Sequence, residues 1–273
     1  APYLLLKARQ GMRMGHQQVI DHMFLDGLED AYDKGRLMGT FAEDCAEAYQ
    51  FTREAQDAFA IRSLSRAQQA ISQGLFKSEI VPVTVQQRRS ETIVDTDEQP
   101  GKARPERIPD LKPAFRQDGT VTAANASSIS DGAAALVLMS ASEADRRGLT
   151  PLARIVGHST HAQEPNMFAT APVGAMRKLS EKTGWNLRDV DLFEINEAFA
   201  VVPMAAMRDL DLPDDKVNVN GGACALGHPI GASGARVLVT LLAAMADRGL
   251  NRGVAALCIG GGEATAMAVE RMQ

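Results

Sequence analysis

Residues 221–234, GGACALGHPIGASG, decide the fold, because this glycine-rich stretch joins a predicted strand to a predicted alanine-rich helix. Its glycines and Pro229 leave little that can form a regular element before about Ala232. A turn that leads into a helix presents backbone amides to an anion or to a developing negative charge. Its histidine, His228, exchanges protons near neutral pH. Two interpretations of the loop alone are open: a catalytic turn, and a plain strand-to-helix turn with a structural histidine.

Strands and helices alternate along the second half of the chain. The patterns predict strands at residues 153–157, 190–195, 216–219, 254–259 and 264–269, and helices at 173–183, 197–208 and 232–248. This alternation is typical of an α/β protein with a mixed, mainly parallel sheet and helices on both faces. Residues 260–262 are too few for a crossover, so the last two strands are expected to be antiparallel.

The first half of the chain is less regular. Residues 1–38 have no clear period, whereas 39–73 predict two helices, the second capped by Thr52 and ended by Gly74. Beyond them the patterns predict an edge strand at 80–85, a long polar loop at 86–119, a buried strand at 132–139 and a short helix at 141–147. A helical and irregular region is therefore expected beside the sheet.

Composition is typical of a soluble globular protein. Apolar residues make up 45% and charged residues 23% of the 273 residues. The net charge of −5 and the lack of a basic block argue against nucleic acid as a partner. No apolar run is long enough to make a membrane a partner. The three cysteines form no CxxC pair, which predicts no metal site and a reduced, cytoplasmic setting.

Three polar side chains follow strands of the predicted sheet. Asn196 ends one strand, His228 lies in the loop after the next, and Cys258 lies near the end of a third. Ligands of such sheets bind at the carboxyl ends of the strands, so the three are expected to converge. Cysteine, histidine and asparagine are used in thiol-based acyl chemistry. The glycines after Cys258 expose backbone amides suited to an oxyanion hole.

Each of these residues also has a structural interpretation. Cys258 taken alone is more often buried core than catalytic, Asn196 suits a helix N-cap, and Glu197 suits the positive end of a helix dipole. Cys45 is interpreted as core, because it lies among alanines on a predicted helix and a free cysteine usually behaves as a small buried hydrophobe. Cys224 is interpreted as structural, because it has no arrangement of activating residues beyond sharing the loop of His228. The joint occurrence of asparagine, histidine and cysteine at one sheet edge is what favours chemistry.

Two stretches of the first half are suited to a ligand. Lys102, Arg104 and Arg107 in the polar loop carry the charge for a phosphorylated ligand, although a solvated loop also explains each of them. Residues 121–130, VTAANASSIS, have small side chains that would let a narrow ligand lie against the backbone. An ordinary turn explains this stretch equally well.

The motifs NEAF at 196–199, GGACALGHPIGASG at 221–234 and CIGGGEA at 258–264 resemble the three C-terminal signatures of the thiolases, and among these the acetyl-CoA acetyltransferases. The likeness extends over the whole chain. It implies a thiolase-like layered fold of two similar α/β halves with an inserted loop domain. On this basis a loop domain is expected at 1–130, a remnant of the N-terminal half-domain at 131–151 and the C-terminal half-domain at 152–273.

The resemblance implies a role for each matching residue. His228 would activate a nucleophilic cysteine and contribute to one oxyanion hole, which Asn196 would complete through a bound water. Cys258 would be the acid/base that removes the α-proton of the second acyl-CoA, or protonates the leaving thiol in the reverse sense. The amide of Gly260 would serve the other oxyanion hole. The pantetheine tunnel for coenzyme A would be lined by Met38, Phe115, Ser127 and Phe199.

The implied substrates are acetyl-CoA, acetoacetyl-CoA and coenzyme A, used without a prosthetic group, and the intact family forms homo-oligomers. The implied reaction, in fatty acid metabolism, is Claisen condensation of two acyl-CoA molecules or thiolytic cleavage of a 3-ketoacyl-CoA. The alternative is a catalytically silent CoA-binding remnant or subunit.

Two departures from the family pattern accompany the likeness. Thiolases are acylated on a cysteine of their N-terminal half, and neither Cys45 nor Cys224 matches it. The chain is therefore expected to lack the N-terminal segment that carries this cysteine, and to be inactive alone. In GRLMG at 35–39, the histidine that many short-chain members carry before Met-Gly is replaced, which leaves the acyl-chain length undecided.

Overall fold

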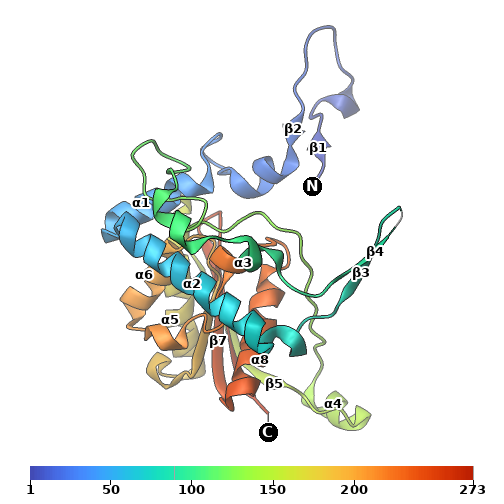
Figure 1. Cartoon of the computed structure of the whole chain (residues 1–273), viewed down its shortest axis with the longest axis vertical. Coiled ribbons are helices and arrows are strands. Elements are labelled where there is room, and N and C mark those ends of the chain that lie inside the picture. Colours follow the sequence, from blue (N-terminus) through green and yellow to red (C-terminus); the bar gives the residue numbers. More distant parts are fainter. Residues whose placement is uncertain (89, 273) are drawn as a thin grey trace.

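The central feature of the molecule is a four-stranded mixed sheet with the strand order β5-β8-β7-β6 (Figure 1). The computed structural model describes residues 1–88 and 90–272. The strands of this sheet are β5 (Ala153–Ala162), β6 (Leu192–Ile195), β7 (Arg252–Ile259) and β8 (Glu263–Arg271). The β6–β7 pair is parallel, whereas β8 is antiparallel to both β7 and β5.

The predicted mixed sheet is confirmed, but the prediction that it is mainly parallel is wrong for these strands. The short turn after β7 makes β8 antiparallel, as expected, and β5 then pairs antiparallel with β8 along its length. The strand predicted at 216–219 does not form, and only an isolated bridge joins Val217 to Phe193. Asn218 has a φ of 47°, a left-handed conformation that interrupts an extended strand.

Helices cover both faces of the sheet, as predicted. On one face, α5 (Ala171–Thr183), α6 (Val201–Leu210) and α1 (Met38–Tyr49) share a hydrophobic core with Val254 and Ala256 of β7. On the other face, α8 (Ser233–Arg248) packs against Ala255 and its neighbours. Successive residues of a strand point to opposite faces, so β7 contributes to both layers. Cys258, two residues beyond Ala256, packs against the α5–α6 side.

The two helices predicted in the first half are confirmed. Thr52 begins α2 (Arg53–Gln73), and its hydroxyl accepts a hydrogen bond from the amide of Ala55 at 3.2 Å. Gly74 ends this helix in the left-handed conformation. The remaining elements are β1 (Tyr3–Leu4), β2 (Ile20–Asp21), β3 (Val83–Gln86), β4 (Glu91–Val94), α3 (Glu98–Lys102), α4 (Ala141–Arg147), α7 (Ala223–Leu226), a π-helical turn at Phe24–Leu28 and short 3₁₀ helices at Ala8–Gln10, Leu75–Ser78, Pro105–Asp110, Pro165–Thr170, Leu187–Asp189 and Asp214–Lys216.

Two other predictions for irregular parts of the chain need correction. Residues 132–139 are not a buried strand: they pair with no described strand, and Val137 and Leu138 are 86% and 71% exposed. The strand predicted at 80–85 becomes β3, which pairs with β4 in a hairpin that projects from the body (Figure 1). The glycine-rich loop also contains a short helix, α7, which the glycine content did not predict.

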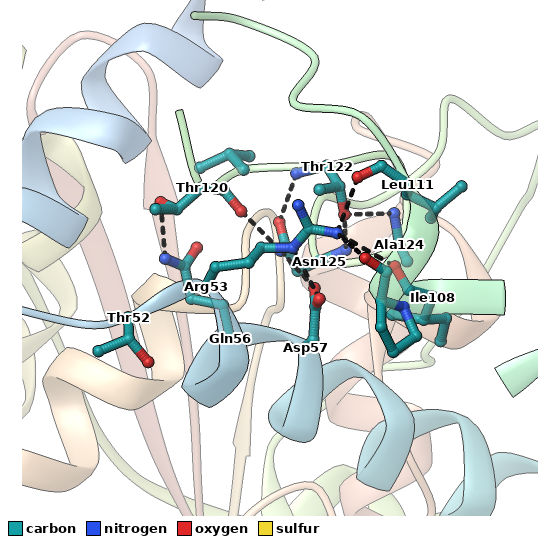
Figure 2. Close-up of polar contacts among 12 residues, drawn as sticks. Thr52, Arg53, Gln56, Asp57, Ile108, Leu111, Thr120, Thr122, Ala124 and Asn125 are labelled. Atoms are coloured by element: carbon teal, nitrogen blue, oxygen red, sulfur yellow. Dashed lines mark hydrogen bonds and ion pairs between the residues drawn. The ribbon is translucent and has the colours of Figure 1, made fainter. Parts of the chain in front are cut away.

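A buried polar network holds the loop at 108–125 against the start of α2 (Figure 2). Arg53 Nε donates to Asp57 Oδ2 at 2.6 Å, and Arg53 Nη2 donates to the carbonyl oxygen of Leu111 at 2.8 Å. Asn125 Nδ2 donates to Asp57 Oδ1 at 3.0 Å. The carbonyl of Asn125 in turn accepts from the amide of Ala200 at 2.8 Å. The network therefore connects α2 to the chain that leads into α6.

Candidate active site

Asn196 lies at the carboxyl end of β6 and is 1% exposed. Its backbone amide donates to the carbonyl of Ala256 on the neighbouring strand β7 at 2.9 Å. Asn196 therefore lies beside the end of β7 that carries Cys258. The interpretation of Asn196 as an N-cap is wrong, because α6 begins only at Val201 and its cap residue is Ala200. The asparagine side chain is instead directed at His228.

His228 is fixed by contacts on both ring nitrogens. Asn196 Nδ2 lies 3.4 Å from His228 Nε2, and His228 Nδ1 lies 2.5 Å from Ser233 Oγ. The Ser233 hydroxyl donates to the carbonyl of Pro229 at 3.0 Å, so its oxygen accepts from Nδ1–H. The side-chain nitrogen Nδ2 of Asn196 is a donor, so Nε2 is the ring nitrogen without a hydrogen. These contacts assign the tautomer that can accept a proton at Nε2.

The surroundings of His228 keep the imidazole neutral. Burial, together with the positive charge of Arg236, lowers the pKa of His228 to about 4. At neutral pH the ring is therefore a hydrogen-bond acceptor and a base. After Nε2 takes a proton, both ring nitrogens are donors, and Nε2–H can then stabilise a carbonyl oxygen that gains negative charge.

Cys258 lies near the end of β7 and is partly buried. Burial raises the pKa of its thiol to about 12, so at neutral pH the thiol holds its proton. The turn at 260–262 follows, and a Cβ at Gly260 would lie 2.9 Å from Met38 Sδ. The backbone of Gly260 therefore lies against Met38.

The structure brings together the residues expected to line the pantetheine tunnel. The rings of Phe115 and Phe199 meet edge to face with 6.0 Å between centroids. Met38 and Phe199 belong to one core cluster, and both Phe115 and Cys258 pack against that cluster. The Ser127 amide and hydroxyl both donate to the carbonyl of Ala198, at 3.0 and 2.9 Å. His228 joins the same region, because its amide donates to the carbonyl of Ser128 at 3.0 Å.

The other two cysteines have surroundings unlike those of a nucleophile. Cys45 is 8% exposed in the core, and burial raises its pKa to about 12. Burial also raises the pKa of Cys224 well above the ordinary value, and its Sγ lies 3.8 Å from the carbonyl oxygen of Glu197. Neither thiol is hydrogen-bonded to His228 in the part of the chain that the structure describes.

Two residues beside the site were missed or misinterpreted from the sequence. Ser233 was missed, although it is fully buried at the start of α8, five residues after His228. Glu197 does not serve the helix that follows it in the chain, because its carboxylate is fully buried and bound to Ser63, Asn218 and Cys224. The Ser63 contact joins residues 134 positions apart, so no local pattern could reveal it.

The basic residues of the polar loop line an open pocket of about 400 Å³ beside α2 and α7, with Lys102, Arg104 and Arg107 on its wall. Lys102 is paired with Glu98 at 2.8 Å, and Arg107 lies 3.7 Å from Asp110. Among the described residues, no cluster of three or more His, Cys, Asp or Glu side chains suits a metal ion. No helix of the described chain is long and apolar enough to cross a membrane.

Comparison with known proteins identifies the family. The sequence matches the thiolase N-terminal domain over residues 1–142 and the thiolase C-terminal domain over residues 149–271. The chain belongs to the thiolase family. Acetyl-CoA acetyltransferases of Pseudomonas aeruginosa and Syntrophomonas wolfei are 51% and 48% identical to it, over 99% and 100% of this chain and 69% of each relative.

Solved structures agree with this assignment. The acetyl-CoA acetyltransferase of Bacillus anthracis has a TM-score of 0.95 at 46% identity, and the Acat5 thiolase of Ascaris suum in complex with coenzyme A has 0.88 at 38% identity. Each similarity covers 100% of this chain and 69% of the other. The predicted thiolase-like fold is thereby confirmed. The division into 1–130, 131–151 and 152–273 stays a prediction.

Proposed function

We propose that this chain carries the enolate-stabilising and acid–base part of the active site of an acetyl-CoA acetyltransferase. The reaction is Claisen condensation of two acyl-CoA molecules, or thiolytic cleavage of a 3-ketoacyl-CoA. The observation that carries the proposal is the Asn196–His228 pair at 3.4 Å, with an unprotonated Nε2, at the sheet edge that also holds Cys258. The relatives named as acetyl-CoA acetyltransferases, and the relative solved with coenzyme A, support it.

The proposed roles follow from the protonation states. His228 takes the proton of the nucleophilic cysteine at Nε2. The resulting Nε2–H, together with a water held by Asn196, then stabilises the enolate oxygen of an acyl-CoA. In cleavage, the carbon–carbon bond of the 3-ketoacyl adduct breaks, its electrons form the enolate, and Cys258 gives its proton to the α-carbon. Condensation reverses this step, and Cys258 must first lose its proton. The amide of Gly260 stabilises the tetrahedral oxyanion at the acylated cysteine.

We further propose that the acylated cysteine is not one of the three in these 273 residues. Cys45 is enclosed by the core, Cys224 is directed at the carbonyl of Glu197, and Cys258 is assigned to acid–base work. Without a covalent nucleophile the double-displacement route is closed. This placement of the thiols also favours the second candidate, a silent CoA-binding protein.

We also propose a cytoplasmic setting for the protein. Exposed apolar residues such as Val137 and Leu138 lead us to propose that it associates into homo-oligomers.

The expected result for the 273-residue chain is no thiolysis of acetoacetyl-CoA and weak binding of coenzyme A. Thiolysis is followed by the loss of absorbance of the acetoacetyl-CoA enolate, and binding is followed by isothermal calorimetry. Turnover by this chain, retained in a Cys45→Ser variant, would contradict the assignment of the nucleophile to another segment. Failure to bind coenzyme A would exclude the silent CoA-binding candidate.

A further inference from the structure

We propose that Glu197 is a positioning residue whose carboxylate holds the loop of His228 in register with Asn196. The inference rests on the proposed function only in taking this pair as the site. Glu197 directly follows Asn196 in the chain and is 0% exposed. Its two oxygens join two parts of the molecule that are distant in sequence: Ser63 on α2, and the stretch that contains Asn218 and Cys224.

All the direct partners of the carboxylate are hydrogen-bond donors. Glu197 Oε1 accepts from Asn218 Nδ2 at 2.8 Å. Oε2 accepts from Ser63 Oγ at 2.7 Å and from the amide of Cys224 at 3.0 Å. Ser63 Oγ accepts in turn from the amide of Gly222 at 2.9 Å. The carboxylate therefore fixes the start of the glycine-rich loop directly and through α2.

The contact with Cys224 connects the carboxylate to His228. Cys224 lies in the first turn of α7, whose amides have no partners within the helix, so the carboxylate serves as a cap. Gly227 and His228 follow this helix immediately. Gly222 makes the approach possible, because a Cβ there would lie 2.4 Å from the carboxyl carbon of Glu197. The positions of Glu197 and the loop backbone therefore depend on each other.

The same carboxylate also acts on Asn196 from the other side. Asn218, which donates to Glu197, accepts from the amide of Ile195 at 2.7 Å and donates to the carbonyl of Ile195 at 2.8 Å. Ile195 is the residue before Asn196. The Glu197 carboxylate thus bonds to Asn218, which holds the residue before Asn196, and to the amide of Cys224, which begins the helix before His228. Asn196 Nδ2 and His228 Nε2 are only 3.4 Å apart.

Glutamine at position 197 would keep the size of the side chain but not its hydrogen bonding. An amide offers one acceptor oxygen and one NH₂ donor, so one of its ends must face a donor. If NH₂ replaces Oε1 it meets Asn218 Nδ2, and if it replaces Oε2 it meets the amide of Cys224. A buried donor without an acceptor is costly, so the loop is expected to shift.

The test is the state of the His228 ring in the Glu197→Gln variant. The ring nitrogens are observed by NMR with ¹⁵N-labelled histidine, and the His228 signals are assigned by their loss in His228→Ala. Wild-type chain is expected to show one neutral tautomer, protonated at Nδ1, with a depressed pKa. In Glu197→Gln the single tautomer is expected to be lost, and the pKa to rise toward the ordinary value near 6.5.

Glu43→Gln is the matched control. Glu43 on α1 is also buried, and it accepts from the amides of Thr120 at 2.8 Å and Val121 at 2.9 Å, away from the loop of His228. The Glu43→Gln change is expected to lower the free energy of unfolding while leaving the His228 signals unchanged. Equal changes at His228 in both variants would mean that general loosening is the cause, and would overturn the proposal.

Unchanged His228 signals in folded Glu197→Gln would also overturn it. If that variant does not fold, Ser63→Ala removes one donor of the network and is expected to move the signals less, in the same direction. No movement in Ser63→Ala would then overturn the proposal. The readout requires neither coenzyme A nor turnover, so its failure is distinguishable from failure of the proposed function.

Discussion

Replacing Asp57 by alanine is expected to lower the free energy of unfolding by about 3 kcal/mol, the lower end of the range for breaking a buried ion pair, because the Arg53 side chain is 20% exposed. Asp57 is 5% exposed and bonds at once to Arg53 and to Asn125. Alanine would leave the Arg53 guanidinium without its counter-ion and one of the two N–H groups of the Asn125 side chain without an acceptor, while the other still donates to the carbonyl of Thr120. Because Asn125 is fully buried, water cannot replace that acceptor.

Urea denaturation measures this change as a shift in the unfolding midpoint at constant slope. The matched control is Glu98→Ala, which removes an exposed partner of Lys102 at a similar distance of 2.8 Å. No measurable change is expected there, since exposed ion pairs contribute little. If Asp57→Ala were as stable as Glu98→Ala, the network of Figure 2 would not hold the loop at 108–125.

The Cys258→Ser variant is expected to slow enzymatic exchange of the acetyl-CoA α-protons by about 10²–10⁴-fold, the usual contribution of a positioned acid–base group. This half of the reaction needs a base and an enolate-stabilising pair, but not an acylated cysteine. It is measured in D₂O by the mass of recovered acetyl-CoA, at a concentration high enough to offset weak binding. Equal exchange by the variant would remove Cys258 from the proposed role.

The pH dependence of this exchange follows from the two shifted groups. Proton removal needs the Cys258 thiolate, and below its pKa of about 12 the thiolate fraction rises tenfold for each pH unit. His228, with a pKa of about 4, does not titrate with solvent over the same range and adds no pH dependence of its own. The exchange rate of the wild-type chain, after subtraction of the Cys258→Ser rate, is therefore expected to rise tenfold per pH unit between about pH 7 and 9. A plateau near neutral pH would mean that another base acts.

Local signals account for the parts of the fold that the sequence predicted well. Thr52 and Gly74 mark the ends of α2 because capping depends on neighbouring residues only. The turn at 260–262 is too short for anything but an antiparallel pair, which determined β7 and β8. The convergence of Asn196 and Cys258 was predictable from parallel strands that end at the same edge.

The failures come from interactions between distant parts of the chain. Residues 132–139 are apolar enough for a buried strand, but a strand also needs a partner, and a local pattern does not supply one. The bond from Ser63 to Glu197 spans 134 positions and leaves no trace in spacing. Asn218 replaces an expected strand with side-chain bonds to Ile195, which depend on its left-handed backbone.

The central claim is that His228, held by Asn196 and Ser233, stabilises the enolate of an acyl-CoA through a proton at Nε2. The most direct measurement compares α-proton exchange of acetyl-CoA in D₂O between the wild-type chain and His228→Ala. The wild-type chain is expected to exchange the α-protons faster than buffer alone. In His228→Ala the part of the rate above the buffer rate is expected to fall by about 10²–10³-fold, as for the loss of other oxyanion-hole donors. A His228→Ala variant that binds coenzyme A and exchanges as fast as the wild-type chain would contradict the claim.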